Sequence, residues 1–158
     1  MKYLFVICFS VFILKTQAQA KWNCGENEKP TVVATFDGAN QTLVIAGTGK
    51  MCDKCRPWGN LKDAIKTVKI NSGVTTIPSN AFGSLYEDEH YNNLEAVIIP
   101  NSVTHIGDAA FWGAVKLRKI NIHNGVTIIG NSAFRVSGLE GSITLPRSIK
   151  SLGLHYYQ

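Results

Sequence analysis

Short apolar runs of the form L-x-x-L-x-L recur along the middle of this chain. They occur as IKTVKI from Ile65, LEAVII from Leu94 and LRKINI from Leu117. The later apolar positions of each run alternate with other residues, which is the period of a β-strand with one buried face. A fourth copy keeps only Ile143 and Leu145. The pattern therefore predicts three short strands and a weaker fourth one.

Between these runs lies an eleven-residue segment that is written three times. It reads SGVTTIPSNAF at 72–82, NSVTHIGDAAF at 101–111 and NGVTIIGNSAF at 124–134. Aligned on the valine, these copies and a partial fourth one are 29, 23 and 23 residues apart, and the longer first step contains the insertion GSLYEDEHYNNL. We expect Gly107 and Gly130, which share one position, to form a tight or left-handed turn. The NSAF segment is expected to form a short helical turn.

The two alternating patterns predict the architecture. A strand that alternates in and out has one apolar face, and a single copy cannot cover that face by itself. Stacked copies bury a continuous core, and L-x-x-L-x-L at a period of about 20–29 residues is the signature of a leucine-rich repeat. The sequence predicts an α/β-type repeat solenoid, with parallel strands on one face and mostly irregular or short helical return segments. We assign residues 63–158 to about three and a half repeats, with Phe82, Phe111 and Phe134 as their largest buried groups.

A different pattern precedes the array. TVVATFD and QTLVIAG alternate in the manner of strands on either side of GAN, and predict a β-hairpin within residues 21–62. A hairpin at this place would cover the open end of the first repeat, where core residues otherwise face water. We assign residues 21–62 to an N-terminal cap.

These motifs resemble the BspA-like leucine-rich repeats of bacterial surface proteins. The resemblance rests on NSVTHIGDAAF, NGVTIIGNSAF and LEAVIIPNSVTHIG, covers roughly 65–153, and extends to the cap through CGENEKPTVVATFDGANQTLVIAGTGKM and Pro57-Trp58. It implies an exported, often cell-surface protein concerned with adhesion or protein binding, and it implies no catalytic residues. The chain departs from the family in its insertion, its few repeats, and Gly113-Ala114, where a Gly-Cys pair often stands.

The first twenty residues are predicted to be a secretory signal peptide. MKYLFVICFSVFILKTQAQA has Lys2, an apolar run that ends at Leu14, and Ala-Gln-Ala at its end. The run is too short for a membrane-spanning helix. Removal of Lys2 and Lys15 lowers the net charge from +5 to +3, and no basic run marks a nucleic-acid-binding patch. We expect an exported chain in the periplasm, at the cell surface or outside the cell, without a nucleic-acid partner.

Three cysteines, Cys24, Cys52 and Cys55, follow this segment. Export permits disulfides, and we expect a structural one from Cys24 to Cys52 or Cys55. CDKC also has the spacing of a redox pair, although Pro57 favours a turn over the helix N-terminus that such a pair needs. A metal site is disfavoured because three thiolates lack an evident fourth ligand.

The outward positions of the predicted strands form rows of side chains without a packing role. The candidate binding residues are Lys69, Ile98, Asn121 and Thr144 in one row, with Thr67 and Lys119 in the neighbouring row. Side chains free of packing on a solvated sheet are available to bind a partner, and an exposed isoleucine beside lysine and asparagine would favour this. The alternative is a solvated face that binds nothing.

Three aromatic residues are candidate partner anchors. The residue that follows Ala-Phe is Trp112 in one copy and Gly83 or Arg135 in the others. Such a variable position is expected to lie on the surface, where Trp112 could contact a partner. Tyr86 and Tyr91 flank the acidic EDEH of the insertion, where protein contact is expected rather than metal, because the acids lack the alternate spacing of a calcium loop. We predict no metal and no cofactor.

No nucleophile, zinc or phosphate-loop motif occurs in the chain, so we expect no enzyme. The prediction is a binding module for a protein or glycan at the bacterial cell surface. Alternatives are a structural stub without a ligand, and a thiol–disulfide active protein that uses Cys52 and Cys55. The final SLGLHYYQ contains no polar cap, and this favours weak end-to-end self-association.

Overall fold

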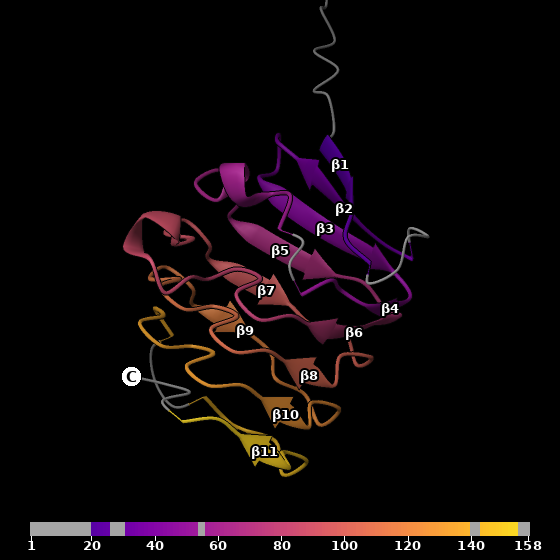
Figure 1. Ribbon diagram of the computed structural model, residues 1–158, viewed down its shortest axis with the longest axis vertical. Coiled ribbons are helices and arrows are strands. Elements are labelled where there is room, and N and C mark those ends of the chain that lie inside the picture. Colours follow the sequence, from indigo (N-terminus) through magenta and orange to yellow (C-terminus); the bar gives the residue numbers. More distant parts are fainter. Residues whose placement is uncertain (1–19, 26–30, 54–55, 140–142, 155–158) are drawn as a thin grey trace, which may run out of the picture.

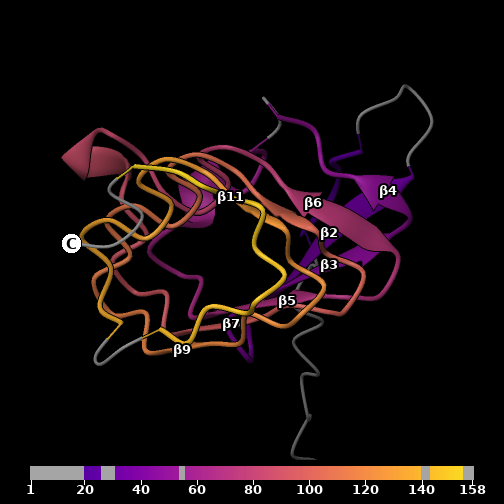
Figure 2. The ribbon, with the colours of Figure 1, turned by 90° about the horizontal axis from the view of Figure 1, so that it is seen from below.

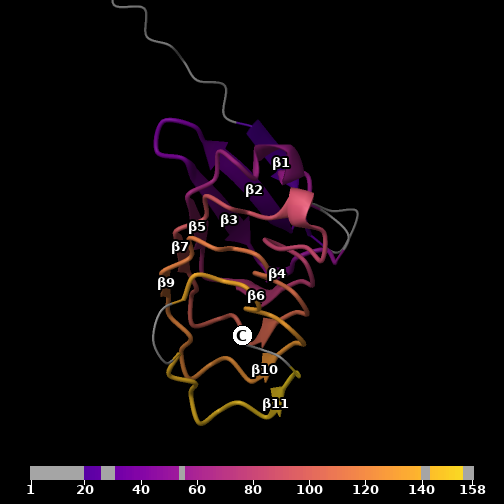
Figure 3. The same cartoon turned by 90° about the vertical axis from the view of Figure 1, so that its left-hand side faces the viewer.

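The computed structural model describes residues 20–25, 31–53, 56–139 and 143–154 of the chain. These residues form a solenoid whose coils stack along the long axis of the molecule (Figure 1; Figure 3). The expected signal peptide lies outside the described residues except for Ala20. No helix in the described part is both long and apolar enough to cross a membrane.

One wall of the solenoid is a six-stranded sheet in the order β1-β2-β3-β5-β7-β9. Its strands are β1 (Ala20–Asn23), β2 (Val32–Asp37), β3 (Thr42–Gly47), β5 (Thr67–Ile70), β7 (Ala96–Ile98) and β9 (Lys119–Ile120). The last four are parallel to one another. Because β5, β7 and β9 fall within the three L-x-x-L-x-L runs, the predicted repeat solenoid with parallel strands is confirmed.

The return segments form a second parallel sheet, which the sequence pattern did not predict. Its order is β11-β10-β8-β6-β4, and its strands are β4 (Gly49–Lys50), β6 (Val74–Ile77), β8 (His105–Ile106), β10 (Ile128–Ile129) and β11 (Ser151–Leu152). β6, β8 and β10 belong to the GVTxI part of the three copies, β11 belongs to the partial fourth copy, and β4 precedes the array in the cap. Seen along the stack, the chain winds round a closed outline with β5, β7 and β9 on one side (Figure 2). The β-branched residues of GVTxI suit such a paired, half-buried strand.

The expected helical turn at NSAF is wrong. The only helical segments in the described part are two 3-10 turns elsewhere, η1 (Gly59–Leu61) and η2 (Glu87–Glu89). In each copy the residue before Ala-Phe has a positive φ, of 55° at Asn80, 51° at Ala109 and 54° at Ser132. A left-handed residue at this place interrupts any right-handed helix.

The two glycines have a different role from the one expected. Neither Gly107 nor Gly130 has a positive φ. A Cβ on Gly107 would lie 2.4 Å from the Ser79 nitrogen, and one on Gly130 would lie 2.4 Å from Asp108 Oδ1. The absence of a side chain therefore allows adjacent coils to approach closely.

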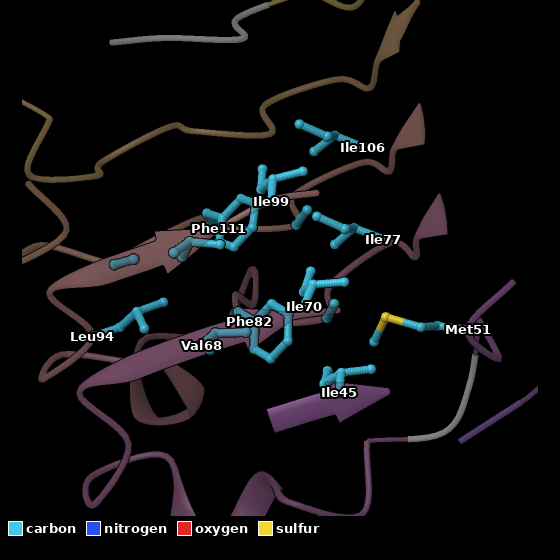
Figure 4. Close-up of a cluster of buried hydrophobic side chains, with 14 of the residues drawn as sticks. Ile45, Met51, Val68, Ile70, Ile77, Phe82, Leu94, Ile99, Ile106 and Phe111 are labelled. Carbon is cyan, nitrogen blue, oxygen red and sulfur yellow. The ribbon is translucent and has the colours of Figure 1, made fainter. Parts of the chain in front are cut away.

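A stack of aromatic rings runs through the core along the solenoid axis. The ring centroids are 5.6 Å apart for Trp58 and Phe82, 5.7 Å for Phe82 and Phe111, and 5.5 Å for Phe111 and Phe134. Figure 4 shows Phe82 and Phe111 among the aliphatic side chains that the strands point inward. The prediction that these phenylalanines are buried is confirmed, since all three are fully buried. Trp58 of the cap continues their row.

The predicted hairpin is present, and it does more than cover the end of the array. β2 and β3 pair antiparallel from Val32 opposite Gly47 to Asp37 opposite Thr42. β3 then pairs parallel with β5, with Thr42 opposite Thr67. The hairpin therefore extends the sheet of the repeats by additional strands while its inward residues join the common core.

The coil at the other end is less well covered. Residues 143–145 form no strand, and the core positions of this coil (Ile143, Leu145 and Ile149) are only partly buried. Leu152 and Leu154 are 39% and 76% exposed. The last described coil therefore presents apolar groups that earlier coils bury.

Candidate binding surfaces

The outward side of the six-stranded sheet carries the predicted rows in register. Lys69 lies opposite Ile98 across β5 and β7, and Val44 of the hairpin lies opposite Lys69. Lys69 is exposed and Ile98 is 49% exposed. The row therefore continues from the repeats onto the cap, which the spacing of the repeats alone did not reveal.

The neighbouring row borders a hollow. Ala96 lies between Thr67 and Lys119 in the sheet register. A hollow of about 580 Å³ occupies this place, lined by Thr67, Glu95, Ala96, Lys116, Arg118 and Lys119. Thr67 is half-buried and Lys119 is exposed. The alanine side chain is smaller than its neighbours and leaves a depression between them. Three of the lining residues are cationic and one is anionic.

Asn121 has a structural role that its row position did not indicate. Its Oδ1 accepts a hydrogen bond from the Ile99 backbone N–H, and its Nδ2 donates to the Ile99 carbonyl, each at 3.3 Å. The side chain thus pairs with the neighbouring coil where β9 has ended. Thr144 is exposed but lies in a coil that forms no strand, so the row is less regular at that end.

Trp112 is half-buried, and one face of its ring is in contact with a cation. The guanidinium carbon of Arg135 lies 5.0 Å from the centroid of the Trp112 ring. Such a cation–π contact stabilises the pair and fixes the ring. Any partner of Trp112 would meet a ring that is already held in place.

Tyr86 and Tyr91 lie in different environments. Tyr86 is 69% exposed, next to Leu85, which is 60% exposed. Tyr91 is only 1% exposed, and its ring meets Phe82 edge-to-face with centroids 6.0 Å apart. The prediction of Tyr91 as a surface anchor is therefore wrong. Its ring attaches the insertion to the aromatic stack, which an isolated local pattern of tyrosines and acids does not reveal.

The expected disulfide of Cys24 is also wrong. Cys24 is a free, fully buried thiol, Cys52 is disulfide-bonded, and Cys55 lies outside the described residues. The Cys52 N–H donates to the Cys24 carbonyl at 2.8 Å, so the two segments are joined through the backbone. Burial raises the pKa of the Cys24 thiol to about 11, which keeps it protonated near neutral pH. Cys24 serves as a small apolar core residue.

A second hollow involves residues that sequence reasoning did not bring together. It has a volume of about 330 Å³ and is lined by Arg56, Gly59, Lys62, Glu89 and Tyr91. The first step between copies is 29 residues long and the later steps are 23. These six extra residues were the sequence feature that could have indicated the hollow, because an added segment makes contacts that the other repeats do not have. Within the described residues, no cluster of three His, Cys, Asp or Glu side chains could hold a metal ion.

Comparison with known structures supports this architecture. The chain is similar to a leucine-rich repeat protein from Eubacterium ventriosum, with 27% identity and a TM-score of 0.71 over 87% of this chain and 35% of that one. It is also similar to one from Bacteroides ovatus, with 20% identity and a TM-score of 0.60 over 98% of this chain and 38% of that one. The chain therefore spans well under half the length of either protein. No curated protein sequence matches it.

The family assignment rests on the repeats themselves. The family model described as "BspA type Leucine rich repeat region (6 copies)" matches residues 60–158, which is more than half of the chain. The match begins in η1, directly before the first L-x-x-L-x-L run, and includes all the predicted copies. The chain belongs to the BspA-type leucine-rich repeat family.

Proposed function

We propose that this protein is a non-enzymatic binding module that holds a protein or glycan ligand on the outward side of its six-stranded sheet. The observation that carries this proposal is the surface formed by Lys69, Ile98, Thr67 and Lys119. It combines an exposed apolar side chain with cations and a hollow. Interfaces commonly centre on such apolar groups within a polar rim.

The geometry supports a preformed site. Lys69 and Ile98 lie opposite each other on β5 and β7, and Thr67, Ala96 and Lys119 lie opposite one another on β5, β7 and β9, so backbone hydrogen bonds keep these side chains at a constant spacing. A rigid sheet loses little conformational freedom on binding. Leucine-rich repeat arrays generally use such extended surfaces for binding partners.

We propose export to the bacterial cell surface as the setting. Residues 1–20 have the pattern of a secretory signal, and the family resemblance points to exported proteins with roles in adhesion. A ligand would then be a protein or glycan met outside the inner membrane. Fractionation of cells that express the full chain tests this, and retention in the cytoplasm would contradict it.

The experiment for the binding face is an array of glycans and extracellular-matrix proteins probed with the purified chain. The test variant is Lys69→Glu/Ile98→Asp, which reverses one charge and removes one apolar group on the face. The control is Lys50→Glu/Ile128→Asp, which makes the same chemical changes on the five-stranded sheet; because Ile128 is half-buried, circular dichroism must first show that both variants are folded. A hit lost only in the first variant supports the proposal, whereas a hit that survives in it moves the ligand elsewhere.

We also propose weak end-to-end self-association through the last described coil. The 39% and 76% exposure of Leu152 and Leu154, beside the outer edge of β11, supports a second copy as the partner. Sedimentation over a range of concentrations should show dimers that Leu154→Asp abolishes. Leu85→Asp, which changes another exposed leucine (60% exposed) on the insertion, should not affect them. A monomer at all concentrations would refute this proposal.

A further inference from the structure

The net charge of the chain is concentrated at the three repeat strands of the six-stranded sheet. Segments 65–70, 94–99 and 116–122 contain β5, β7 and β9, and they hold five basic residues (Lys66, Lys69, Lys116, Arg118 and Lys119) and one acidic residue (Glu95). These segments carry a net +4, because the chain has 16 basic and 11 acidic residues and 11 and 10 of them lie elsewhere, for a net +1. All six side chains are exposed. The three strands lie side by side, so the fold gathers the charge into one patch (Figure 1).

Backbone pairing places these charges in line across three coils. The Glu95 N–H donates to the Lys66 carbonyl at 2.8 Å, and the Arg118 N–H donates to the Glu95 carbonyl at 2.9 Å. Lys119 lies in the neighbouring row, opposite Ala96. Adjacent strands are about 4.8 Å apart, so the backbones of the first and third coils are about 10 Å apart. Cations of two coils therefore flank a central coil that carries a single charge.

The lysines of this patch have no carboxylate partner in the described part of the chain. The ion pairs between described residues are Arg56–Glu89 and Lys62–Asp63, and neither includes a lysine of the patch. Lys116 Nζ donates to the neutral Asn93 Oδ1 at 2.8 Å. Like charges held close together repel one another and attract anions from solution. The patch is therefore complementary to a ligand that brings negative charge.

The hollow of about 580 Å³ lies within this patch. Three of the five cations line it, together with Glu95. Ala96 leaves its centre open, and Ile98, two residues further along β7, is 49% exposed. A matching ligand therefore has acidic groups, at least one hydrogen-bond donor for Glu95, and an apolar face for Ile98.

The composition of the patch favours a glycan over a protein. The centres of protein interfaces are enriched in aromatic residues and depleted in lysine. The three segments contain four lysines and no aromatic residue. A protein that covered these lysines would remove their ammonium groups from water, which is costly. A narrow linear glycan leaves most of each lysine head in contact with water, while its ring hydroxyls and C–H groups match Glu95 and Ile98.

We propose that this patch binds a linear acidic glycan, one that carries carboxylate or sulfate groups along its length. The glycan lies across β5, β7 and β9, with acidic groups beside the cations of the hollow and beside Lys66 and Lys69. Between them, Glu95 accepts a hydrogen bond from a sugar hydroxyl, and Ile98 contacts the C–H face of a ring. The inference rests on the proposed function, because it names the class of ligand for the same face.

The test is fluorescence anisotropy of labelled glycan fragments of equal length, titrated with the purified chain at neutral pH. Heparin supplies sulfate groups, hyaluronan supplies carboxylates alone, and dextran is neutral. Because the attraction is electrostatic, we expect both acidic glycans to bind at least about tenfold more tightly than dextran. Raising NaCl from about 0.1 M to about 1 M shortens the Debye length from about 10 Å to about 3 Å, and should weaken the binding at least about tenfold.

Two double variants provide a matched pair. Lys69→Gln/Lys119→Gln should weaken binding of the acidic glycans by about three- to tenfold, because each exposed ion contact contributes modestly. Lys50→Gln/Lys150→Gln removes the same two charges from exposed positions on and next to the five-stranded sheet, and should weaken it by less than about twofold. Equal losses in the two variants would show a response to net charge alone and would overturn the proposal.

Three other outcomes would also overturn it. These are dextran binding as tight as that of hyaluronan, absence of binding by both acidic glycans, and tighter binding of a poly-glutamate peptide, which would indicate a protein ligand. A neutral glycan or a protein that binds on the array and is lost in Lys69→Glu/Ile98→Asp, without binding of heparin or hyaluronan, would leave the proposed function standing and this inference wrong. Acidic glycan binding that survives in both Lys69→Glu/Ile98→Asp and Lys69→Gln/Lys119→Gln would place the ligand elsewhere and contradict both.

Discussion

Truncation of the central ring of the aromatic stack tests how the repeats are held together. Phe111 is fully buried and stacks on Phe82 at 5.7 Å and on Phe134 at 5.5 Å, with interplanar angles of 16° and 1°. Removal of a buried phenylalanine side chain typically costs about 3–5 kcal/mol, including the cavity that it leaves. Each aromatic pair adds about 0.5–1.5 kcal/mol beyond burial, so we place Phe111→Ala near the upper end, at about 4–5 kcal/mol.

The control variants separate burial from stacking. Phe134→Ala removes a ring with one stacked neighbour among the described residues, and should cost about 1 kcal/mol less than Phe111→Ala. Phe111→Leu keeps most of the apolar volume and should cost about 1–2 kcal/mol. Urea unfolding, followed by circular dichroism and by tryptophan fluorescence, gives these free energies.

The same experiment reports on cooperativity. Trp58 stacks on Phe82 at the cap side of the array, so in a Trp22→Phe/Trp112→Phe background, where Trp58 is the sole tryptophan, fluorescence follows that end of the solenoid. In a repeat protein, stability depends on the contacts between neighbouring coils. The two signals should coincide in this background and separate when Phe111→Ala is added to it. A loss below about 1.5 kcal/mol, or a larger loss for Phe134→Ala, would show that the stack is not the main link between coils.

Three further changes have defined outcomes. Ala109 has a φ of 51°, a left-handed conformation that glycine adopts more easily than alanine, so Ala109→Gly should raise the free energy of unfolding by about 0.5–1 kcal/mol in urea denaturation. Ala110→Gly at the next position is the control and should lower the free energy of unfolding. Asn121→Ala should cost about 1–2 kcal/mol by thermal unfolding, because it removes both hydrogen bonds to the Ile99 backbone, and an unchanged melting temperature would contradict this. The folded state holds the Cys24 proton to a pKa of about 11, against an ordinary value of 9.0, so stability should fall as the pH rises through that interval. Cys24→Ala should flatten that fall in denaturation curves measured at several pH values, and an identical pH dependence would refute the assignment.

The general form of the fold could be predicted from local patterns. Alternation within IKTVKI or LEAVII is a property of adjacent residues, and it specifies which side chains of a strand point inward whatever coil lies beside it. The spacing of 23 residues between copies then requires stacking, because each copy needs a neighbour to cover its apolar face. The parallel sheet and the buried phenylalanines follow from these two facts, and the hairpin follows from the same kind of alternation on either side of GAN.

Other features depended on which residues the stacking brings together. The second sheet exists because Thr76 lies opposite His105, and His105 opposite Ile128, across coils that are far apart in sequence. The hydrogen bonds of Asn121 reach Ile99 on the preceding coil. A local pattern shows that a polar residue is present but does not show which backbone group lies within its reach.

The insertion shows most clearly the difference between what a local pattern predicts and what the folded chain decides. From the sequence alone, YEDEHY is an added acidic segment between two tyrosines, and both tyrosines are equivalent candidates for the surface. In the folded chain Tyr91 packs on Phe82 while Tyr86 remains 69% exposed. The inward strand positions and the stacking of the repeats were determined by the sequence, because each copy carries the same local pattern. The non-periodic part was decided only by the tertiary structure, because its partners lie in the cap and in neighbouring coils.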